Sequence, residues 1–376
     1  MTAAGPRGFA ERFAVPSCML DVRSPAPGRR QGGGTLAPGV VLISRASDAE
    51  AGAVGALLAR ANVPNVRIDA DRLAEVAVLF GPSGGHVSDG RCRIAPTVTW
   101  VRHFAATAIA PPPRPAADSP VTAQFTRESW AATVRQIGAA SAVAIDAERP
   151  PLLVQYHAAA RCQVTVPRTA LANDLSGAAE LIGSERLVVK VAHQHFVEAE
   201  PGLLGGIFPV VAAREELTGQ RIGGTPLIVQ EYIEHDAELR VYYIDGRVRC
   251  FEVGKAAPSD PWLMPDRVTA RLVPTPAAVT RAVGRLAQAM GLRCAAFDFL
   301  LTGEDRVVFL EADPNGDWRW LERKAGLAPV TTAMAELLGG LHRARRPGMA
   351  ASAGAASFNL LAFLTGGCGS TRVRPG

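Results

Sequence analysis

The sequence predicts a mixed α/β protein, with strands and helices alternating in its first third and an α+β arrangement of hairpins and helices after it. Alternation is indicated by the apolar run Val40–Ser44, the alanine-rich helical stretch Ala49–Ala61 and the short run Val66–Ile68. The hairpins are indicated by apolar runs on both sides of Asp245-Gly246, a dipeptide that strongly predicts a two-residue turn. Together these patterns predict layered sheets covered by helices.

The first part of the chain divides into an arm and a domain. Residues 1–38 are rich in Gly, Pro and Arg without periodicity, so we expect a disordered N-terminal arm outside the fold. Residues 39–115 are expected to form an α/β domain, to which Thr97–Val101 contributes a further strand. The stiff proline-rich run Pro111–Pro115 marks the boundary that follows.

A helix is expected after this boundary. Thr126 is a suitable N-cap, and Trp130, Val134 and Ile137 then recur at i, i+4 and i+7 as one apolar face. Later apolar runs predict strands at Val164–Arg168, Leu187–Ala192, Leu227–Ile233, Leu239–Ile244 and Val248–Val253.

The clearest helix signal starts at Thr275, a good N-cap, with Pro276 at the first helical position. Gly291 fits the left-handed residue that ends such a helix. Its apolar stripe consists of Val279, Val283, Leu286 and Met290. Beyond it, residues 346–376 are expected to form a C-terminal helix and tail.

Composition excludes several classes of protein. The 376 residues carry a net charge of only +5 and no block of like charges, so a nucleic-acid-binding tail is not indicated. The six cysteines are scattered, which argues against a zinc site or a disulfide framework and favours a cytoplasmic protein. No apolar stretch predicts a signal peptide or a membrane span.

A cluster of acids ends the hairpin predicted from apolar runs at 295–301 and 307–310. If its turn is centred between residues 304 and 305, Asp298 and Glu311 lie directly opposite each other. Asp313 and Asn315 follow with further oxygen ligands, a set that suits Mg²⁺. The alternative is a solvated hairpin end whose acids face water.

Two further features are informative. Lys190 ends an apolar strand in a chain with three lysines, which favours a point charge held for phosphate, the alternative being a side chain that reaches the surface. The segment from Gln230 to Ile233, with Glu238 and Arg240 beyond it, offers backbone groups for an adenine edge, a carboxylate for ribose and a guanidinium for phosphate.

The order of these features resembles the ATP-grasp superfamily: a strand-ending lysine, then V-Q-E-Y-I and E-L-R-V-Y, then F-L-E-A-D-P-N-G-D-W-R-W-L-E. The last segment is most similar to the graspetide (microviridin-type) ligases, and V-P-R-T at Val166–Thr169 adds to the likeness. The resemblance implies a Rossmann-like pre-ATP-grasp domain followed by two α+β subdomains that clamp ATP within 116–345. The central lid subdomain is expected near 165–233 and the catalytic subdomain near 234–345.

The resemblance also implies the roles of individual residues. Lys190 would contact the ATP phosphates and Arg240 the transferred phosphate, while Glu238 would lie near the ribose. Adenine would be held by Gln230, Glu231, Tyr232 and Ile233. Mg²⁺ would be held by Asp298 and Glu311, with oxygen atoms of Asp313 and Asn315 beside them.

Three departures from the family pattern stand out. Asp313 occupies a position where relatives usually have Asn, a second lysine expected near Leu152 is absent, and the loop after Lys190 lacks a glycine-rich lid. Arg149 is the residue that could substitute for the missing lysine.

The resemblance implies an ATP- and Mg²⁺-dependent ligase that activates a carboxylate as an acyl phosphate. The substrate would be a precursor peptide, with leader and core, whose Asp or Glu side chains become crosslinked to hydroxyl or amine groups. One alternative is a RimK-like ligase that adds amino acids to a small molecule or protein tail, and another is a degenerate, non-catalytic peptide-binding module. No nucleic-acid or membrane partner is expected, and a homodimer remains open.

Overall fold

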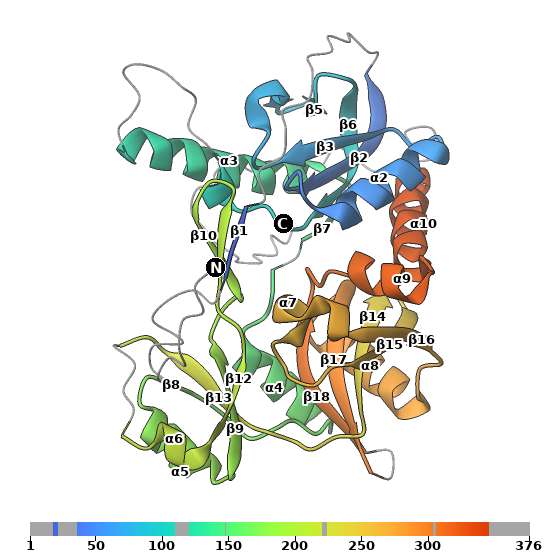
Figure 1. The fold of residues 1–376 in the computed structure, drawn as a ribbon. Helices are drawn as coiled ribbons and strands as arrows, with labels where there is room; N and C mark the ends of the chain where they lie inside the picture. Colours follow the sequence, from blue (N-terminus) through green and yellow to red (C-terminus); the bar gives the residue numbers. More distant parts are fainter. Residues whose placement is uncertain are drawn as a thin grey trace, which may run out of the picture.

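The structure, a computed structural model, describes residues 18–21, 36–109, 120–146, 148–219, 224–303 and 306–345. Three larger sheets occupy this part of the chain, which we name the N-terminal, central and C-terminal sheets, and a small three-stranded sheet accompanies them (Figure 1). None of the helices within the described ranges has the length and apolarity that crossing a bilayer requires.

The N-terminal sheet has the order β3-β2-β6-β5-β4, with β7 paired to β6. The pairs β2–β3, β2–β6 and β6–β7 are parallel, as the alternation of strands and helices predicts. The antiparallel hairpin β4–β5 was not predicted. Its elements are β2 (Ala37–Ser44), α2 (Ala49–Arg60), β3 (Asn65–Asp69), η1 (Leu73–Glu75), β4 (Ala77–Gly81), β5 (Gly84–Ser88), β6 (Arg93–Val101), η2 (Ala106–Ala108), α3 (Pro120–Ala140) and β7 (Val143–Ile145).

Two expectations for this region are corrected. Helix α3 begins at Pro120, so Thr126 lies inside it and donates from Oγ1 to the carbonyl of Thr122 at 3.1 Å instead of capping it. Val134 and Ile137 are buried against the N-terminal sheet, as their spacing predicts. Residues Cys18–Asp21 of the arm form strand β1, so this short piece belongs to the fold, whereas the proline-rich run lies outside the described residues.

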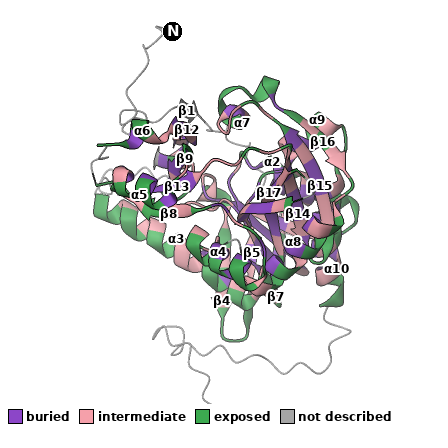
Figure 2. Ribbon diagram, turned by 90° about the horizontal axis from the view of Figure 1, so that it is seen from below, coloured by how far each residue is buried: buried purple, intermediate pink, exposed green. Residues whose placement is uncertain are grey.

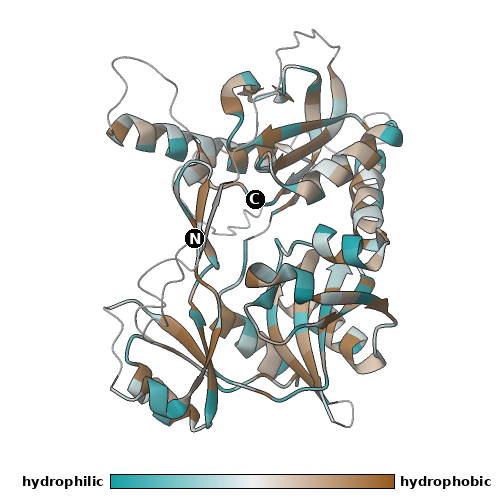
Figure 3. Cartoon of the chain, in the orientation of Figure 1, coloured by the Kyte–Doolittle hydropathy of each residue, from teal (hydrophilic) through white to brown (hydrophobic). Residues whose placement is uncertain are grey.

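The central sheet is antiparallel with the order β12-β9-β13-β8. Val164–Arg168 is not a strand, because Thr165 makes only an isolated bridge to Val308 and the strand starts at Thr169. Helix α5 covers the apolar face of this sheet. Figure 3 shows the strands as largely hydrophobic and α6 as hydrophilic. The elements are β8 (Thr169–Ala172), α5 (Leu175–Ile182), β9 (Arg186–Val191), β12 (Val210–Ala213), α6 (Arg214–Leu217) and β13 (Leu227–Glu231).

The small sheet has the order β1-β11-β10 and is antiparallel. Strands β10 (Phe196–Glu200) and β11 (Leu203–Gly206) form a hairpin between β9 and β12. Strand β1 pairs with β11 over four residues, which adds a third strand to a ribbon that alone would be marginally stable.

The C-terminal sheet is antiparallel with the order β16-β15-β14-β17-β18. One face packs on α4 and α8, and Figure 2 shows buried residues along β14, β15 and β17. The elements are α4 (Leu152–Arg161), β14 (Ala237–Ile244), β15 (Arg247–Gly254), α7 (Asp260–Leu263), η3 (Pro265–Arg267), β16 (Thr269–Val273), α8 (Ala277–Ala289), β17 (Cys294–Thr302), β18 (Arg306–Asp313), α9 (Arg319–Ala325) and α10 (Pro329–Ala344).

Most local signals in this half are confirmed. Asp245 and Gly246 form the β14–β15 turn, with φ of 46° and 92°. Gly291 has φ of 65° after α8, as predicted. The start of α8 differs by one residue, because Pro276 occupies the N-cap position and Thr275 provides no cap.

Helices α9 and α10 return to the N-terminal domain. Helix α10 packs on α2, and one apolar core continues from β2 and β6 through these helices to β14 and β15. The N-terminal domain and the C-terminal sheet therefore share a core, while the central sheet has its own. The predicted tail 346–376 lies outside the described residues.

Candidate active site

Three neighbouring strands of the C-terminal sheet align the central residues of the site. Asp298 on β17 lies opposite Glu311 on β18, as predicted, and opposite Arg240 on β14. The register between Asp298 and Glu311 depends on a bulge, because Phe299 already pairs with Phe309. The three side chains consequently share the sheet face that α8 does not cover.

Arg240 and Asp298 form an ion pair in this row, in which one guanidinium nitrogen contacts both carboxylate oxygens. Arg240 Nη1 lies 3.1 and 2.9 Å from the two carboxylate oxygens of Asp298. Burial raises the pKa of Asp298 to about 6, since Arg240 offsets only part of this effect and Glu311 and Glu238 add to it. Burial lowers the pKa of Arg240, but Asp298, Tyr242 and Asp313 together more than compensate, and the net pKa is well above its ordinary value.

Glu311 is held by two cations. Its Oε2 lies 2.9 Å from Arg149 Nη2 and 3.3 Å from Lys190 Nζ. Burial alone would raise the pKa of Glu311, but Lys190 and Arg149 more than offset this and keep the pKa well below its ordinary range. The carboxylate of Glu311 is therefore ionised, and two positively charged groups lie beside it.

Lys190 reaches Glu311 from the central sheet. Its neighbours Val189 and Leu187 pack against α5, so alternation along β9 turns Lys190 towards the opposite face. Only 8% of Lys190 is exposed, which excludes the surface alternative. The site therefore lies between two sheets, with its ammonium group on one and its acids on the other.

A second bridge joins the two sheets beside this contact. Gln230 on β13 donates to the hydroxyl of Tyr156 at 2.6 Å, and that hydroxyl donates to the carbonyl of Leu310 at 2.9 Å. Gln155, also on α4, donates from Nε2 to the carbonyl of Ala312 at 3.0 Å and accepts at Oε1 from the amide of Ala312 at 2.6 Å. Helix α4 thus fixes β18, the edge strand that carries Glu311, against the central sheet.

The rest of the predicted adenine segment lies at the connection between β13 and β14. Glu231 accepts from the backbone amide and Nε of Arg168 at 2.9 and 2.7 Å. The guanidinium of Arg186 lies 4.0 Å from the ring centroid of Tyr232. Ile233 follows, and its carbonyl accepts a hydrogen bond from His235 Nδ1 at 2.9 Å. The side chains of Glu231 and Tyr232 are thus engaged within the protein, and so are their backbone amides, which donate to the carbonyls of Arg168 and Arg186 at 2.9 and 3.0 Å.

Of the three remaining predicted residues, Glu238 and Asp313 lie two positions along their strands from Arg240 and Glu311. Glu238, two residues before Arg240 on β14, pairs with Lys255 at 2.7 Å, and its charge acts on Asp298. The charge of Asp313 acts on both Arg149 and Arg240. Asn315 lies in the following loop, where its backbone amide donates to Asp313 Oδ1 at 3.0 Å.

The two acids of the site fit Mg²⁺ as a partial set of ligands. Across the described residues, no three or more His, Cys, Asp or Glu side chains are grouped as a metal cage. Mg²⁺ is usually held by one or two carboxylates together with waters and substrate phosphates, and not by a complete protein cage. The opposed carboxylates of Asp298 and Glu311 supply that number of hard oxygen ligands.

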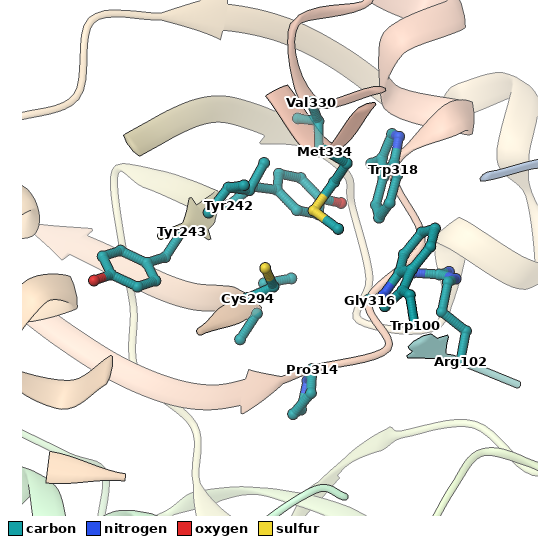
Figure 4. A pocket seen from close by; sticks show the side chains of 13 residues that line it. Trp100, Arg102, Tyr242, Tyr243, Cys294, Pro314, Gly316, Trp318, Val330 and Met334 are labelled. Atoms are coloured by element: carbon teal, nitrogen blue, oxygen red, sulfur yellow. The ribbon is translucent and has the colours of Figure 1, made fainter. Parts of the chain in front are cut away.

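Several residues of the site were not predicted from the sequence. Arg149 was only considered as a substitute for a missing lysine, and Tyr156 was not singled out. Arg102 was also missed, although it follows β6 at the carboxyl edge of a parallel sheet, where functional groups gather. Figure 4 shows Arg102 beside Trp100, Trp318 and Gly316 in a small pocket under the Asp313–Trp318 loop.

No protein-family model and no curated protein sequence matches the chain. Solved structures do match it over most of its length. The macrocyclase MdnC from Microcystis aeruginosa, bound with precursor peptide MdnA, is 20% identical with a TM-score of 0.67, and the match covers 80% of this chain and 99% of that chain.

Two further structures extend this likeness. The ATP-grasp ligase PsnB, complexed with a variant of its minimal precursor, Mg and ADP, is 16% identical with a TM-score of 0.62, and covers 82% of this chain and 99% of that chain. A RiPP-associated ATP-grasp ligase from Chryseobacterium gregarium, in complex with ADP and a leader and core peptide, is 15% identical with a TM-score of 0.58 and covers 80% and 96%. The chain therefore has the fold of the ATP-grasp ligases, which confirms at the level of the fold the resemblance carried by its motifs.

Proposed function

We propose that this protein is an ATP-dependent ligase that joins a carboxylate to a hydroxyl or amine through an acyl phosphate. The observation that carries the proposal is the meeting of Lys190 from the central sheet with Glu311 from the C-terminal sheet. Arg149 on the same carboxylate and Arg240 on Asp298 complete a site with three cations and two opposed acids. Such a site can accept the charge of a nucleotide triphosphate and a divalent cation.

The reaction needs no covalent enzyme nucleophile. A substrate carboxylate oxygen attacks the γ-phosphorus of ATP, and the bond to the ADP oxygen breaks. The hydroxyl or amine then attacks the acyl carbon, loses its proton, and phosphate leaves. Lys190, Arg149 and Arg240 would neutralise charge on the phosphate oxygens, and Asp298 and Glu311 would hold Mg²⁺, which would supply further positive charge for phosphoryl transfer.

A precursor peptide is the proposed substrate. Three structures with this fold, those of MdnC, PsnB and the Chryseobacterium gregarium ligase, contain precursor peptides. By this analogy the activated carboxylates are Asp or Glu side chains of a ribosomally made peptide with leader and core, and each bond formed removes one water.

The test is incubation of the protein with a candidate peptide encoded beside its gene, ATP and Mg²⁺, followed by mass spectrometry. We expect loss of one water per crosslink, together with ADP release. Glu311→Gln and Asp298→Asn should each reduce turnover by at least about 100-fold, because phosphoryl transfer depends on this charge.

A matched control is Glu252→Gln, which alters an exposed acid paired with Arg271 on the same sheet. This variant should keep turnover within about twofold. ADP release with free amino acids alone would instead select the RimK-like ligase. Nucleotide binding without ADP release in the presence of any substrate would select the non-catalytic module.

A further inference from the structure

Arg102, at the carboxyl end of β6 in the N-terminal domain, is a buried cation that contacts the C-terminal half of the protein. Only 1% of its side chain is exposed. Its Nε donates to Asp48 at 3.0 Å within its own domain. Its Nη2 donates to the carbonyl of Asn315 at 3.2 Å and to Asp317 Oδ1 at 2.7 Å.

The segment that Arg102 contacts is the Asp313–Trp318 loop, which follows directly from Glu311. The guanidinium carbon of Arg102 also lies 4.8 Å from the ring centroid of Trp318 and 5.4 Å from that of Trp100. Glu50 adds a second anchor from the N-terminal domain, since its Oε1 accepts from the backbone amide of Trp318 at 2.9 Å. The N-terminal domain therefore fixes both the side chains and the backbone of this loop.

The same loop is bonded to the row of charges on the C-terminal sheet. The hydroxyl of Tyr242 donates to the carbonyl of Asp317 at 2.6 Å and accepts from Arg240 Nε at 3.0 Å. Arg240 in turn holds Asp298. A continuous set of hydrogen bonds thus runs from Arg102, through the loop, to the acid proposed to hold the metal.

The loop has little room to move. A Cβ added at Gly316 would lie 2.5 Å from the Cβ of Ala296 and 2.7 Å from Nη2 of Arg240, so the loop backbone is packed directly on β17 and on Arg240. A displacement of the loop would consequently disturb Arg240 and the Asp298 carboxylate with it.

We propose that Arg102 is a positioning residue for the divalent-cation site: by holding the Asp313–Trp318 loop, it fixes Arg240 and, through Arg240, the carboxylate of Asp298. This inference rests on the proposed function, because it assumes the cation site described there. Arg102 does not touch the cation itself. It acts from another domain, through Asp317 and the carbonyl of Asn315, as outer-sphere partners orient metal ligands elsewhere.

The test uses two variants of the full chain. Asp317→Ala removes the acceptor on the loop side, and because the Asp317 side chain is 56% exposed, the fold should tolerate the change. Arg102→Lys keeps a charge beside Asp48 but loses the planar fork that reaches two acceptors. The matched control is Glu336→Gln on α10, which alters an acid of similar exposure paired with Arg247 on β15.

The measurement is binding of Mn²⁺, as a paramagnetic probe for Mg²⁺, to protein loaded with equimolar ADP, well below the melting temperature of every variant. We expect Asp317→Ala and Arg102→Lys each to weaken Mn²⁺ binding about 10-fold, while ADP affinity without metal stays unchanged. The combined loss in the double variant should be smaller than the product of the two single losses, because both changes remove the shared contact between Arg102 and Asp317.

Unchanged Mn²⁺ affinity in Asp317→Ala, with the wild type binding normally, would overturn the role of Arg102 and leave the proposed function intact. Additive losses in the double variant would also overturn it. If wild-type protein loaded with ADP bound no Mn²⁺, the cation site of the proposed function would itself be wrong.

Discussion

At the scale of single residues, Glu311 is the acid that two cations of the site contact. Two cations from different elements, Lys190 on β9 and Arg149 before α4, contact the same carboxylate oxygen. Charges this close and this buried interact far more strongly than exposed pairs. Substitution of either cation should therefore change kcat measurably.

Arg149 gives the sharpest prediction at this scale. Arg149→Ala should lower kcat about 100-fold, because one of the charges that would stabilise the moving phosphoryl group is lost. Arg149→Lys should recover most of that activity, because an ammonium group can replace the single nitrogen with which Arg149 contacts Glu311. ADP release with peptide substrate measures both.

Arg161→Ala is the control, because Arg161 is an exposed arginine at the end of the adjoining helix α4. It should change kcat by less than about twofold. If Arg149→Ala behaved like this control, Arg149 would have no part in the reaction.

The sequence predicted the contact of a site residue only where both partners lie close together in the chain. The opposition of Asp298 and Glu311 was predicted by counting along one hairpin, although the count was right only because a bulge compensates for the turn. The contacts of Arg149 and Arg102 join residues 162 and 215 positions apart in sequence. No short-range pattern reports such pairs.

At the scale of elements, the turn between β14 and β15 determines where Arg240 lies. Gly246 has φ of 92°, a conformation that side chains rarely adopt. Gly246→Ala should lower the free energy of unfolding by about 1–2 kcal/mol, measured by urea denaturation. Nothing lies near the added methyl group, so the cost would be conformational.

Gly284→Ala provides a control of opposite sign. Gly284 lies within α8, also with open space around it, and alanine there should raise the free energy of unfolding by up to about 1 kcal/mol. Equal effects of the two substitutions would contradict the assigned turn conformation.

Elements with turn or cap signals were predicted well, and those set by tertiary contacts were not. Asp245-Gly246 and Gly291 dictate backbone conformations by themselves, and both were identified. The start of α3 was misplaced at Thr126, because the apolar residues of its first turns, Val121 and Phe125, are exposed and lie outside the buried stripe of Val134 and Ile137. Strand β1 was missed because it depends on pairing with β11, which is almost 200 residues away.

At the scale of the whole molecule, the N-terminal domain and the C-terminal sheet are joined by a buried charge network. Burial would raise the pKa of Asp48, but Arg102, His103 and the hydrogen bonds from Ser44 and Ala51 together hold the pKa well below its ordinary value. Asp48→Ala leaves Arg102 without its partner in β2–α2 and should cost about 3–5 kcal/mol, measured by urea denaturation near neutral pH.

The sign of the pH dependence follows from the lowered pKa. The ionised carboxylate of Asp48 stabilises the folded state at pH values above its ordinary pKa near 4, and this contribution is lost as the pH falls further. The difference between wild type and Asp48→Ala should therefore shrink in acid. Glu234→Ala, at an exposed ion pair, should change stability by less than about 1 kcal/mol at any pH.

The sequence predicted the fold class, but it did not predict how the sheets pack against one another. Helices α9 and α10 return to the N-terminal domain and merge two cores, so the C-terminal half cannot be treated as an independent clamp. The central sheet, with its separate core, is the part placed across the site from the acids. This arrangement is what lets Lys190 face Asp298 and Glu311.

The most direct measurement is a crystal structure with Mg²⁺ and a non-hydrolysable ATP analogue. The account predicts a metal ion about 2.1 Å from carboxylate oxygens of both Asp298 and Glu311, with Lys190 Nζ within hydrogen-bonding distance of a phosphate. A metal ion bound away from these two acids, or Lys190 turned away from the phosphates, would contradict it.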